Sequence, residues 1–337
     1  MNDKNALNHR ESVESSLHAA PKDSPVGSRL TRREAIAMAV ASAASMRSAA
    51  AAESAAFSFR WLLSTAMYGQ LDLFDLLPEA TTLDMAALDL WPRVHGAQRE
   101  AIDEHGLEVV RAHVEDAGCR VECLTRYDLG AAGLADEIAI AAATGAGTIV
   151  SGPKGSRTPP REALAKEVAA FVESMAPMHE RAAEAGVTIA IENHRRNLFE
   201  SADSLRYLAE EVDRRGWSSL KVALAPAHLP QQPAAVAQLV RDLGSTLHVF
   251  YAWERGNEFL RKKPTGRETE QLPGVGTFDF APVVAALAAI DFAGWTSIFM
   301  HPVPRGIPAA GTVAATTTAI AAARDHLETL RPGAPDA

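Results

Sequence analysis

The fold follows from a short pattern that recurs along the chain, and its clearest copy is Gly186-Val187-Thr188-Ile189-Ala190-Ile191-Glu192-Asn193-His194. A glycine ends a helical stretch, because it adopts the left-handed conformation that stops a helix. A short run of β-branched and apolar residues follows, which is typical of a strand buried on both faces. The stretch therefore predicts one helix, then one buried strand that ends in polar side chains.

The same helix-to-strand unit recurs until eight strands are counted. The predicted strands are Phe59–Thr65, Ala86–Trp91, Cys119–Thr125, Thr148–Ser151, Val187–Glu192, Lys221–Ala225, Leu247–Tyr251 and Trp295–Met300. Helical stretches are predicted at about 70–79, 98–116, 132–144, 161–185, 201–214, 232–243, 279–290 and 314–330. Regular alternation of strands and helices favours a parallel sheet.

Eight units in residues 53–337 predict a single α/β domain, a closed (β/α)8 TIM barrel, because the length is close to that of such barrels. The alternative is a doubly wound open sheet. That fold often carries a Gly-x-Gly-x-x-Gly turn after its first strand. Here Ser64-Thr65-Ala66-Met67-Tyr68-Gly69 stands in that place, which favours the barrel.

Residues 1–52 are set apart from the barrel by their composition. The arginine pair Arg32-Arg33 precedes a weakly apolar, alanine-rich stretch, and small residues at Ala50-Ala51-Ala52 follow. Paired arginines, a mild apolar region and a small-residue cleavage site indicate a cleaved bacterial twin-arginine export signal. We therefore expect a periplasmic or other extracytoplasmic protein, with an incidental disordered tail as the alternative.

Composition removes several classes of function. The 337 residues carry a formal net charge of −9, which opposes broad nucleic-acid binding. Only two cysteines occur, so a disulfide scaffold or a cysteine-built zinc module is excluded. The sequence lacks a run of about 18 apolar residues, and a membrane span is not expected.

In a barrel of this type, function lies at the carboxyl ends of the strands. Glu192 ends an apolar strand, where a carboxylate needs a hydrogen bond, a counter-charge or a metal. With the predicted ligands His228, His248 and His301 at neighbouring strands, it suggests a site for a divalent ion, which could be Mn, Zn, Co, Mg or Fe. Glu192 and His228 are the predicted catalytic residues.

Other polar and aromatic residues at strand ends are predicted to bind substrate. They are Trp91, Lys154, Asn193, His194, Trp253 and Arg305. Each has a simpler interpretation, since the tryptophans could be rim packing, Lys154 could be solvated and His248 could be a hydrogen-bonded core residue. Flat aromatic faces at the mouth would also suit the apolar face of a sugar.

Four motifs in this order carry a resemblance to a known family: Leu88-Asp89-Leu90-Trp91, Glu192-Asn193-His194, Ala227-His228-Leu229 and Pro273-Gly274-Val275-Gly276-Thr277-Phe278-Asp279-Phe280. From about residue 59 to 332 the chain resembles the xylose isomerase-like TIM barrel superfamily, which includes sugar phosphate isomerase/epimerase-type proteins. The resemblance implies a divalent metal and proton abstraction beside a carbonyl of a sugar or polyol.

The resemblance also shows departures from the family's metal site. Typical members ligate the metal with Glu, Asp, His and Glu on strands five to eight. Glu192 matches the first, but Ala225 stands where the Asp belongs. The strand-seven position is His248 or Phe250, and strand eight offers Ser297, Phe299 or His301 in place of a carboxylate. A mechanism with two carboxylates is therefore not expected, whereas one with Glu192 as the single base remains.

Three functions follow from these observations. The first is an exported, metal-assisted isomerase, epimerase or lyase that acts on a carbohydrate. The second is a catalytically degenerate barrel that binds a sugar or partner without turnover, suggested by the missing Asp and Glu. The third, an endonuclease-IV-like nuclease, is opposed by the negative charge and by the shortage of metal ligands.

Overall fold

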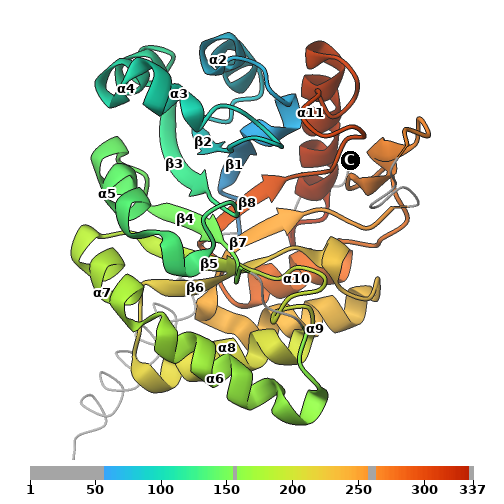
Figure 1. Cartoon of the computed structure of the whole chain (residues 1–337). Helices are drawn as coiled ribbons and strands as arrows, with labels where there is room; N and C mark the ends of the chain where they lie inside the picture. The colour runs from blue at the N-terminus through green and yellow to red at the C-terminus, as the bar shows by residue number, and fades with distance from the viewer. Residues whose placement is uncertain (1–56, 155–157, 257–262, 334–337) are drawn as a thin grey trace, which may run out of the picture. The chain divides into compact units, whose positions relative to one another are not determined.

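In the computed structural model, which describes residues 57–154, 158–256 and 263–333, eight parallel strands close into a barrel in chain order (Figure 1). The strands are β1 (Trp61–Ser64), β2 (Ala87–Leu90), β3 (Arg120–Thr125), β4 (Thr148–Ser151), β5 (Thr188–Glu192), β6 (Leu220–Leu224), β7 (Leu247–Ala252) and β8 (Trp295–Ile298). β1 pairs with β8 through Trp61 opposite Thr296. This pairing confirms the (β/α)8 barrel and excludes the open sheet, whose edge strands would stay unpaired.

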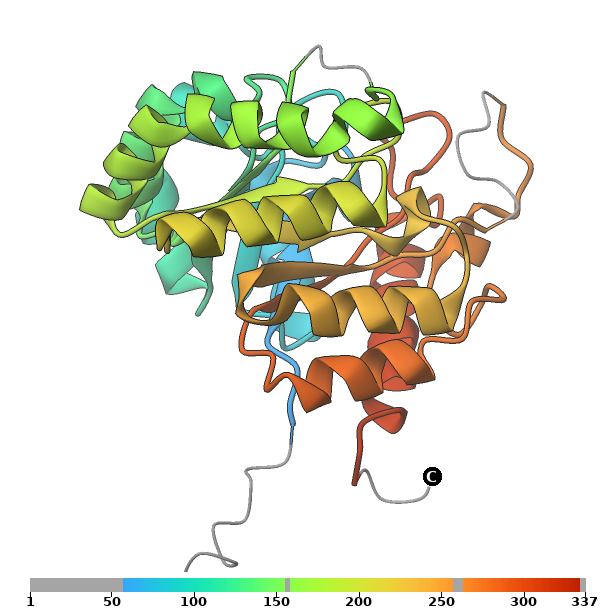
Figure 2. The ribbon, with the colours of Figure 1, turned by 90° about the horizontal axis from the view of Figure 1, so that it is seen from below.

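Helices surround the barrel on its outer side. They are α2 (Leu73–Thr82), α3 (Glu100–His105), α4 (Leu107–Asp116), α5 (Ala135–Thr144), α6 (Leu164–Ser174), α7 (Ala176–Ala185), α8 (Ala202–Arg215), α9 (Pro233–Leu243), α10 (Ala281–Ala289) and α11 (Val313–Thr329). Figure 2 shows α6, α8, α9 and α10 lying side by side in that order. Glycines with positive φ end α5, α7 and α8, as the sequence predicts.

Short 3-10 helices lie in the connections: η1 (Thr65–Tyr68), η2 (Ala131–Gly133), η3 (Arg161–Ala163), η4 (Pro226–His228), η5 (Gly244–Thr246) and η6 (Glu268–Gln271). Two of them matter for the site. η4 follows β6 and ends at His228. η6 lies in the long connection between β7 and α10.

Two predicted helices are each split in the structure. The stretch 98–116 divides into α3 and α4 at Gly106, whose φ of 86° breaks the helical path. The stretch 161–185 divides into η3, α6 and α7, with Pro177 near the start of α7. Proline lacks an N–H group and so favours the first turn of a helix. Sequence periodicity alone did not separate these neighbouring helices.

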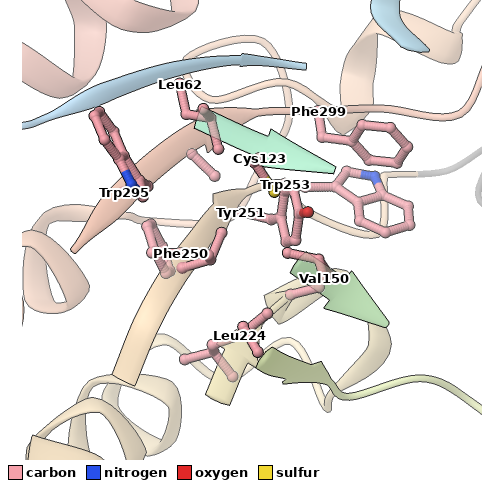
Figure 3. Close-up of a cluster of buried hydrophobic side chains, with 14 of the residues drawn as sticks. Leu62, Cys123, Val150, Leu224, Phe250, Tyr251, Trp253, Trp295 and Phe299 are labelled. Carbon is pink, nitrogen blue, oxygen red and sulfur yellow. The ribbon is translucent and has the colours of Figure 1, made fainter. Parts of the chain in front are cut away.

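The barrel interior is filled by side chains and is not a channel. Leu62, Cys123, Val150 and Tyr251 are fully or almost fully buried there, and Cys123 is a free thiol. Figure 3 shows Trp253 and Phe299 next to each other at one side of this cluster, with Trp295 at the other side. Trp295 begins β8 and Phe299 follows its end, so the two sides correspond to the two ends of the barrel.

The described residues between 57 and 333 form one compact unit. The expected export signal at residues 1–52 lies outside the described residues. In the part of the chain that the structure describes, helices with the length and apolarity needed to cross a bilayer are absent.

Candidate functional site

A cavity of about 450 Å³ opens at the carboxyl ends of the strands. Its wall combines one carboxyl group, imidazoles, aromatic rings and guanidinium groups. The lining residues are Trp91, His95, Tyr127, Gly152, Pro153, Glu192, His194, Arg195, Arg196, Asn197, His228, Trp253, Phe299, His301 and Arg305. The volume is within the range of small-molecule sites, and the position is where barrel enzymes carry their chemistry.

Glu192 is the last residue of β5 and is 5% exposed. Among the described residues, none forms a hydrogen bond or ion pair with its carboxyl group, which therefore faces the cavity unpartnered. Burial, with a smaller contribution from the negative charge of Asp89, raises the pKa of Glu192 well above its usual value. A carboxyl group whose pKa is raised in this way is a stronger base, once ionised, than an exposed glutamate.

A second buried carboxyl group, Asp89, lies behind the cavity wall on β2. It accepts hydrogen bonds from Thr125 Oγ1 at 2.8 Å and from Trp91 Nε1 at 2.6 Å. Burial raises the pKa of Asp89 to about 6, although the hydrogen bonds from Thr125 and Trp91 oppose the shift. Asp89 was not predicted as a site residue, and its role in the structure is to hold the Trp91 indole.

Four imidazoles border the cavity in two pairs. The rings of His194 and His228 are 4.2 Å apart between centroids, and those of His95 and His301 are 4.8 Å apart. Burial lowers the pKa of His95 to about 4 and that of His228 to about 2. The pKa of His301 is lowered well below its usual value for the same reason. These rings are therefore neutral at pH 7, and each offers one N–H donor and one nitrogen acceptor.

Aromatic rings form the apolar part of the cavity wall. Trp91 and Phe299 are stacked with centroids 4.9 Å apart and an interplanar angle of 13°. Trp253 meets Phe299 edge to face at 5.0 Å and His228 edge to face at 4.9 Å. Such a surface suits the C–H face of a sugar ring, while the imidazoles beside it suit hydroxyl and carbonyl groups.

Gln271 of η6 fixes the ends of β7 and β8 relative to each other. Its Oε1 accepts from Trp253 Nε1 at 3.0 Å and from the backbone N–H of His301 at 3.2 Å. Its Nε2 donates to the His301 carbonyl at 2.9 Å. Because Gln271 is fully buried, these bonds are shielded from water and hold two cavity residues in place.

The turn that carries His228 is held in a similar way. Gln231 Nε2 donates to the carbonyls of Pro226 and Leu229, both at 2.9 Å. Gln231 Oε1 accepts from the backbone N–H of Arg255 at 2.8 Å. The segment after β7 is thereby tied to the η4 turn, so that the imidazole of His228 is positioned by residues from two loops.

Most of the predicted site residues come together at this cavity. Seven line it: Glu192, Trp91, His194, His228, Trp253, His301 and Arg305. The structure places the other three, Asn193, Lys154 and His248, elsewhere.

Asn193 is fully buried and joins β5 to the segment after β6. Its Oδ1 accepts from Ala225 N at 2.7 Å and its Nδ2 donates to Ala225 O at 3.0 Å. Both polar atoms of the Asn193 amide are thus hydrogen-bonded to the backbone of the barrel, and Asn193 does not line the cavity. Lys154 is exposed beside the cavity, and its Nζ donates to the Asp128 carbonyl at 3.0 Å, so it does not line the cavity either.

His248, which was predicted as a metal ligand, lies near the opposite end of the barrel. It is the second residue of β7, and its Nε2 is 3.0 Å from Thr148 Oγ1 at the start of β4. Ala252 at the carboxyl end of β7 is four residue steps further along the strand, a length of about 13 Å. The strand was predicted correctly, but it begins only one residue before His248.

The residues present do not fit a divalent metal. In the described ranges 57–154, 158–256 and 263–333, groups of three or more His, Cys, Asp or Glu side chains arranged to hold a metal are absent. Glu192 contributes one carboxyl group, and Asp89 is occupied by Thr125 and Trp91. The expected set of Glu192, His228, His248 and His301 is also divided between the two ends of the barrel.

Several lining residues were missed by the sequence analysis: His95, Tyr127, Arg195, Arg196, Asn197 and Phe299. Phe299, Tyr127 and Arg195 gave a signal, because each stands within a predicted strand or at most three residues after its end. His95 follows β2 by five residues in a loop, and nothing in the sequence pattern indicates where such a loop turns.

Comparisons with known proteins agree with the fold. The family model described as Xylose isomerase-like TIM barrel matches residues 79–331. A structure of D-psicose 3-epimerase with D-tagatose from Clostridium cellulolyticum H10 is 13% identical, with a TM-score of 0.61 over 80% of this chain and 98% of that one. No curated protein gives a significant match.

Two further solved structures share the barrel. The IOLI protein, solved with a bound zinc atom, is 14% identical and has a TM-score of 0.63 over 81% of this chain and 99% of its own. The 3-keto-D-glucoside 4-epimerase YcjR from E. coli is 15% identical and has a TM-score of 0.59 over 80% of this chain and 100% of its own. At these identities, the likeness shows the fold alone.

Proposed function

We propose, from the premise that this chain belongs to the xylose isomerase-like TIM barrel family, that it is a carbohydrate isomerase or epimerase with Glu192 as its proton-transfer group. The observation that carries the proposal is the unpartnered, buried carboxyl group of Glu192, which faces a cavity lined by imidazoles and aromatic rings. Solved structures with the same fold include sugar epimerases, which supports a carbohydrate or polyol substrate.

The proposed reaction moves a proton at a carbon next to a carbonyl. The Glu192 carboxylate takes the proton, and the electron pair of the broken C–H bond forms the carbon–carbon double bond of an enediol. The carbonyl oxygen gains negative charge, which a neutral imidazole N–H from His228 or His301 stabilises. In isomerisation, Glu192 returns the proton to the former carbonyl carbon, and the hydroxyl proton of the adjacent carbon passes to the former carbonyl oxygen. In epimerisation, the original carbon takes a proton from water on its other face, and Glu192 releases its proton to solvent.

Burial of Glu192 serves this reaction. It raises the pKa of the carboxyl group, and so makes the ionised form a stronger base than an exposed glutamate. The metal assistance expected from the sequence lacks a suitable set of ligands among the described residues. The reaction is therefore derived through the carboxyl group and the imidazoles.

Deuterium exchange tests the proposal. The protein is incubated in D2O with a panel of ketoses, aldoses and keto-polyols, and loss of the C–H signal beside the carbonyl is followed by proton NMR. We expect exchange with at least one sugar, and Glu192→Gln to slow it by about 10²- to 10⁴-fold, the usual contribution of a general base. Glu184→Gln, at an exposed position on α7, is the matched control and should exchange at the wild-type rate.

A second candidate, a barrel that binds a carbohydrate without turnover, is supported by the single cavity carboxyl group and the poor fit to a metal. It predicts that sugars raise the melting temperature of the protein, while exchange is absent in both the wild type and Glu192→Gln. Exchange that persists unchanged in Glu192→Gln would contradict the proposed enzyme.

We also propose that the chain is exported by the twin-arginine route, a proposal that rests on the sequence of residues 1–52 alone. Fusion of these residues to a reporter that works only outside the cytoplasm tests it. The reporter should be active, and replacement of Arg32 and Arg33 by lysine should abolish its activity. Equal activity with and without the arginine pair would reject this route.

A further inference from the structure

Three guanidinium groups line the cavity without carboxylate partners. Arg195 and Arg196 follow β5, and Arg305 lies in the segment after β8. Within the described residues, none of the three side chains forms a salt bridge or a hydrogen bond. The charges of Arg195 and Arg196 contribute to the lowered pKa of Glu200, but its carboxyl group accepts hydrogen bonds from Thr158 Oγ1 and from the backbone N–H of Arg196 at 2.8 Å.

Arginines packed against the barrel's outer helices are held by carboxylates. Arg99 and Arg126 both contact Glu137, and Arg206 contacts Asp203 and Asp242. At the cavity, Arg195 is half-buried, whereas Arg196 and Arg305 are exposed at the mouth. Their guanidinium groups are therefore accessible to a ligand that enters the cavity.

The carboxyl groups near the cavity do not pair with these guanidinium groups. Among the described residues, Glu192 forms no ion pair with any of the three arginines, and Asp89 accepts from Trp91 and Thr125. The charge of Arg305 also contributes to the lowered pKa values of His95, His194 and His301. An anion in the cavity would meet guanidinium donors and neutral imidazoles, which together favour carboxylates and phosphates.

We propose, as an extension of the proposed function, that the cavity selects a carbohydrate with an anionic group, held by Arg305 together with Arg195 and Arg196. The stacked rings of Trp91 and Phe299 receive the apolar face of the sugar. The anionic group is a carboxylate, as in a sugar acid, or a phosphate, as in a sugar phosphate. These two sources share the same recognition chemistry and are separated by the test.

Calorimetric titration with three matched sugars tests this selection. D-Glucuronate, D-glucose 6-phosphate and D-glucose differ in the group at carbon six. We expect at least one of the two anions to bind about tenfold or more tightly than D-glucose, the ratio that one charge-assisted hydrogen bond supplies. Preference for D-glucuronate identifies a carboxylate site, and preference for D-glucose 6-phosphate identifies a phosphate site.

Arg305→Gln is expected to remove most of the preference for the anion, measured as the ratio of the anion's affinity to that of D-glucose. Arg161→Gln is the control and should keep the full ratio, because Arg161 is exposed and, among the described residues, contacts a carboxylate only through a 3.7 Å pair with Asp203. The proposal is overturned if D-glucose binds as tightly as both anions, if neither anion binds, or if Arg305→Gln keeps the full preference.

Glu192→Gln separates this inference from the proposed function. The variant should keep the preference for the anion over D-glucose, because that preference rests on the arginines, but should lose deuterium exchange. If the wild type prefers the anion but shows no exchange, the proposed enzymatic function is rejected and the anion site is supported. If exchange depends on Glu192 but the protein shows no preference for an anion, the anion site is rejected and the enzymatic function is supported.

Discussion

The indole of Trp91 donates from Nε1 to Oδ2 of Asp89 at 2.6 Å, so that a fully buried carboxyl group holds a ring of the cavity wall. Thr125 Oγ1 donates to the same carboxyl group at 2.8 Å. Two donors compensate in part for the cost of burying Asp89 in the barrel. The aromatic wall and the polar interior of the barrel are thus one connected structure.

Trp91→Phe tests this connection. Phenylalanine can keep the stacking with Phe299 but removes the N–H donor, which leaves Asp89 with Thr125 alone. We expect the free energy of unfolding at pH 7.5 to fall by about 1–3 kcal/mol, the cost of an unsatisfied buried polar group. Denaturant titration of the wild type and the variant measures this difference in unfolding free energy.

The control for this prediction is Trp61→Phe. Trp61 Nε1 donates to Glu328 at 2.9 Å in a partly buried setting, where water can replace the lost donor. The unfolding free energy of Trp61→Phe should therefore fall by less than that of Trp91→Phe. Equal losses in the two variants would show that the bond to Asp89 is not the important contact of Trp91.

Gln271 provides the second prediction, because it joins Trp253 to both backbone groups of His301. Gln271→Ala removes all three bonds and should lower the stabilisation that a bound sugar gives, measured as the shift in melting temperature at saturation. Gln238→Ala, on the exposed face of α9 with a bond to Asp242 at 2.7 Å, should keep the full shift. A full shift in Gln271→Ala would mean that Trp253 and His301 keep their positions without it.

Asn193 provides the third prediction, since the structure assigns it to the barrel and not to a ligand. Asn193→Ala removes two buried bonds to Ala225 and should reduce the unfolding free energy by about 2–3 kcal/mol. Sugar affinity of the folded protein, measured by calorimetry, should stay near the wild-type value. A large loss of affinity with unchanged stability would restore Asn193 as a substrate-binding residue.

The barrel could be predicted because the same helix-to-strand pattern recurs eight times along the sequence. Each buried parallel strand is a short apolar run, as in Ile189-Ala190-Ile191, and glycines such as Gly186 mark the helix ends. An error in one unit, such as the unseen break at Gly106, leaves the count of eight unchanged. The position of a residue along its strand is harder to predict, because a short apolar run does not mark where the strand begins. For this reason His248 was placed at the wrong end of β7.

Most of the predicted residues that line the cavity lie on a strand or in the first residues after one, and Arg305 is the exception. Glu192, Trp91 and Trp253 follow the barrel register, so their place at the mouth could be read from the sequence. His95 and Arg196 lie in loops, whose path depends on contacts between segments far apart in the chain. Gln271 is a similar case, since it acts through bonds to residues 18 and 30 positions away.

Glu254 predicts how the stability of the protein depends on pH. It is 2% exposed, and its Oε2 accepts from the backbone N–H groups of Thr277 and Phe278, each at 2.9 Å. Gly276 leaves room for this carboxyl group, because a Cβ at that position would lie 2.2 Å from it. Burial raises the pKa of Glu254 from 4.5 to about 7, although the two backbone donors oppose the shift.

Because the folded protein holds this proton more tightly than the unfolded chain, Glu254 makes the folded state less stable as pH rises from about 4.5 to about 7. A shift of this size corresponds to roughly 3 kcal/mol at most. Glu254→Gln keeps an oxygen acceptor for both N–H groups but cannot ionise. The unfolding free energy of the wild type relative to Glu254→Gln should therefore decrease between pH 5 and pH 8, and parallel pH profiles of the two proteins would show that Glu254 does not titrate in this range.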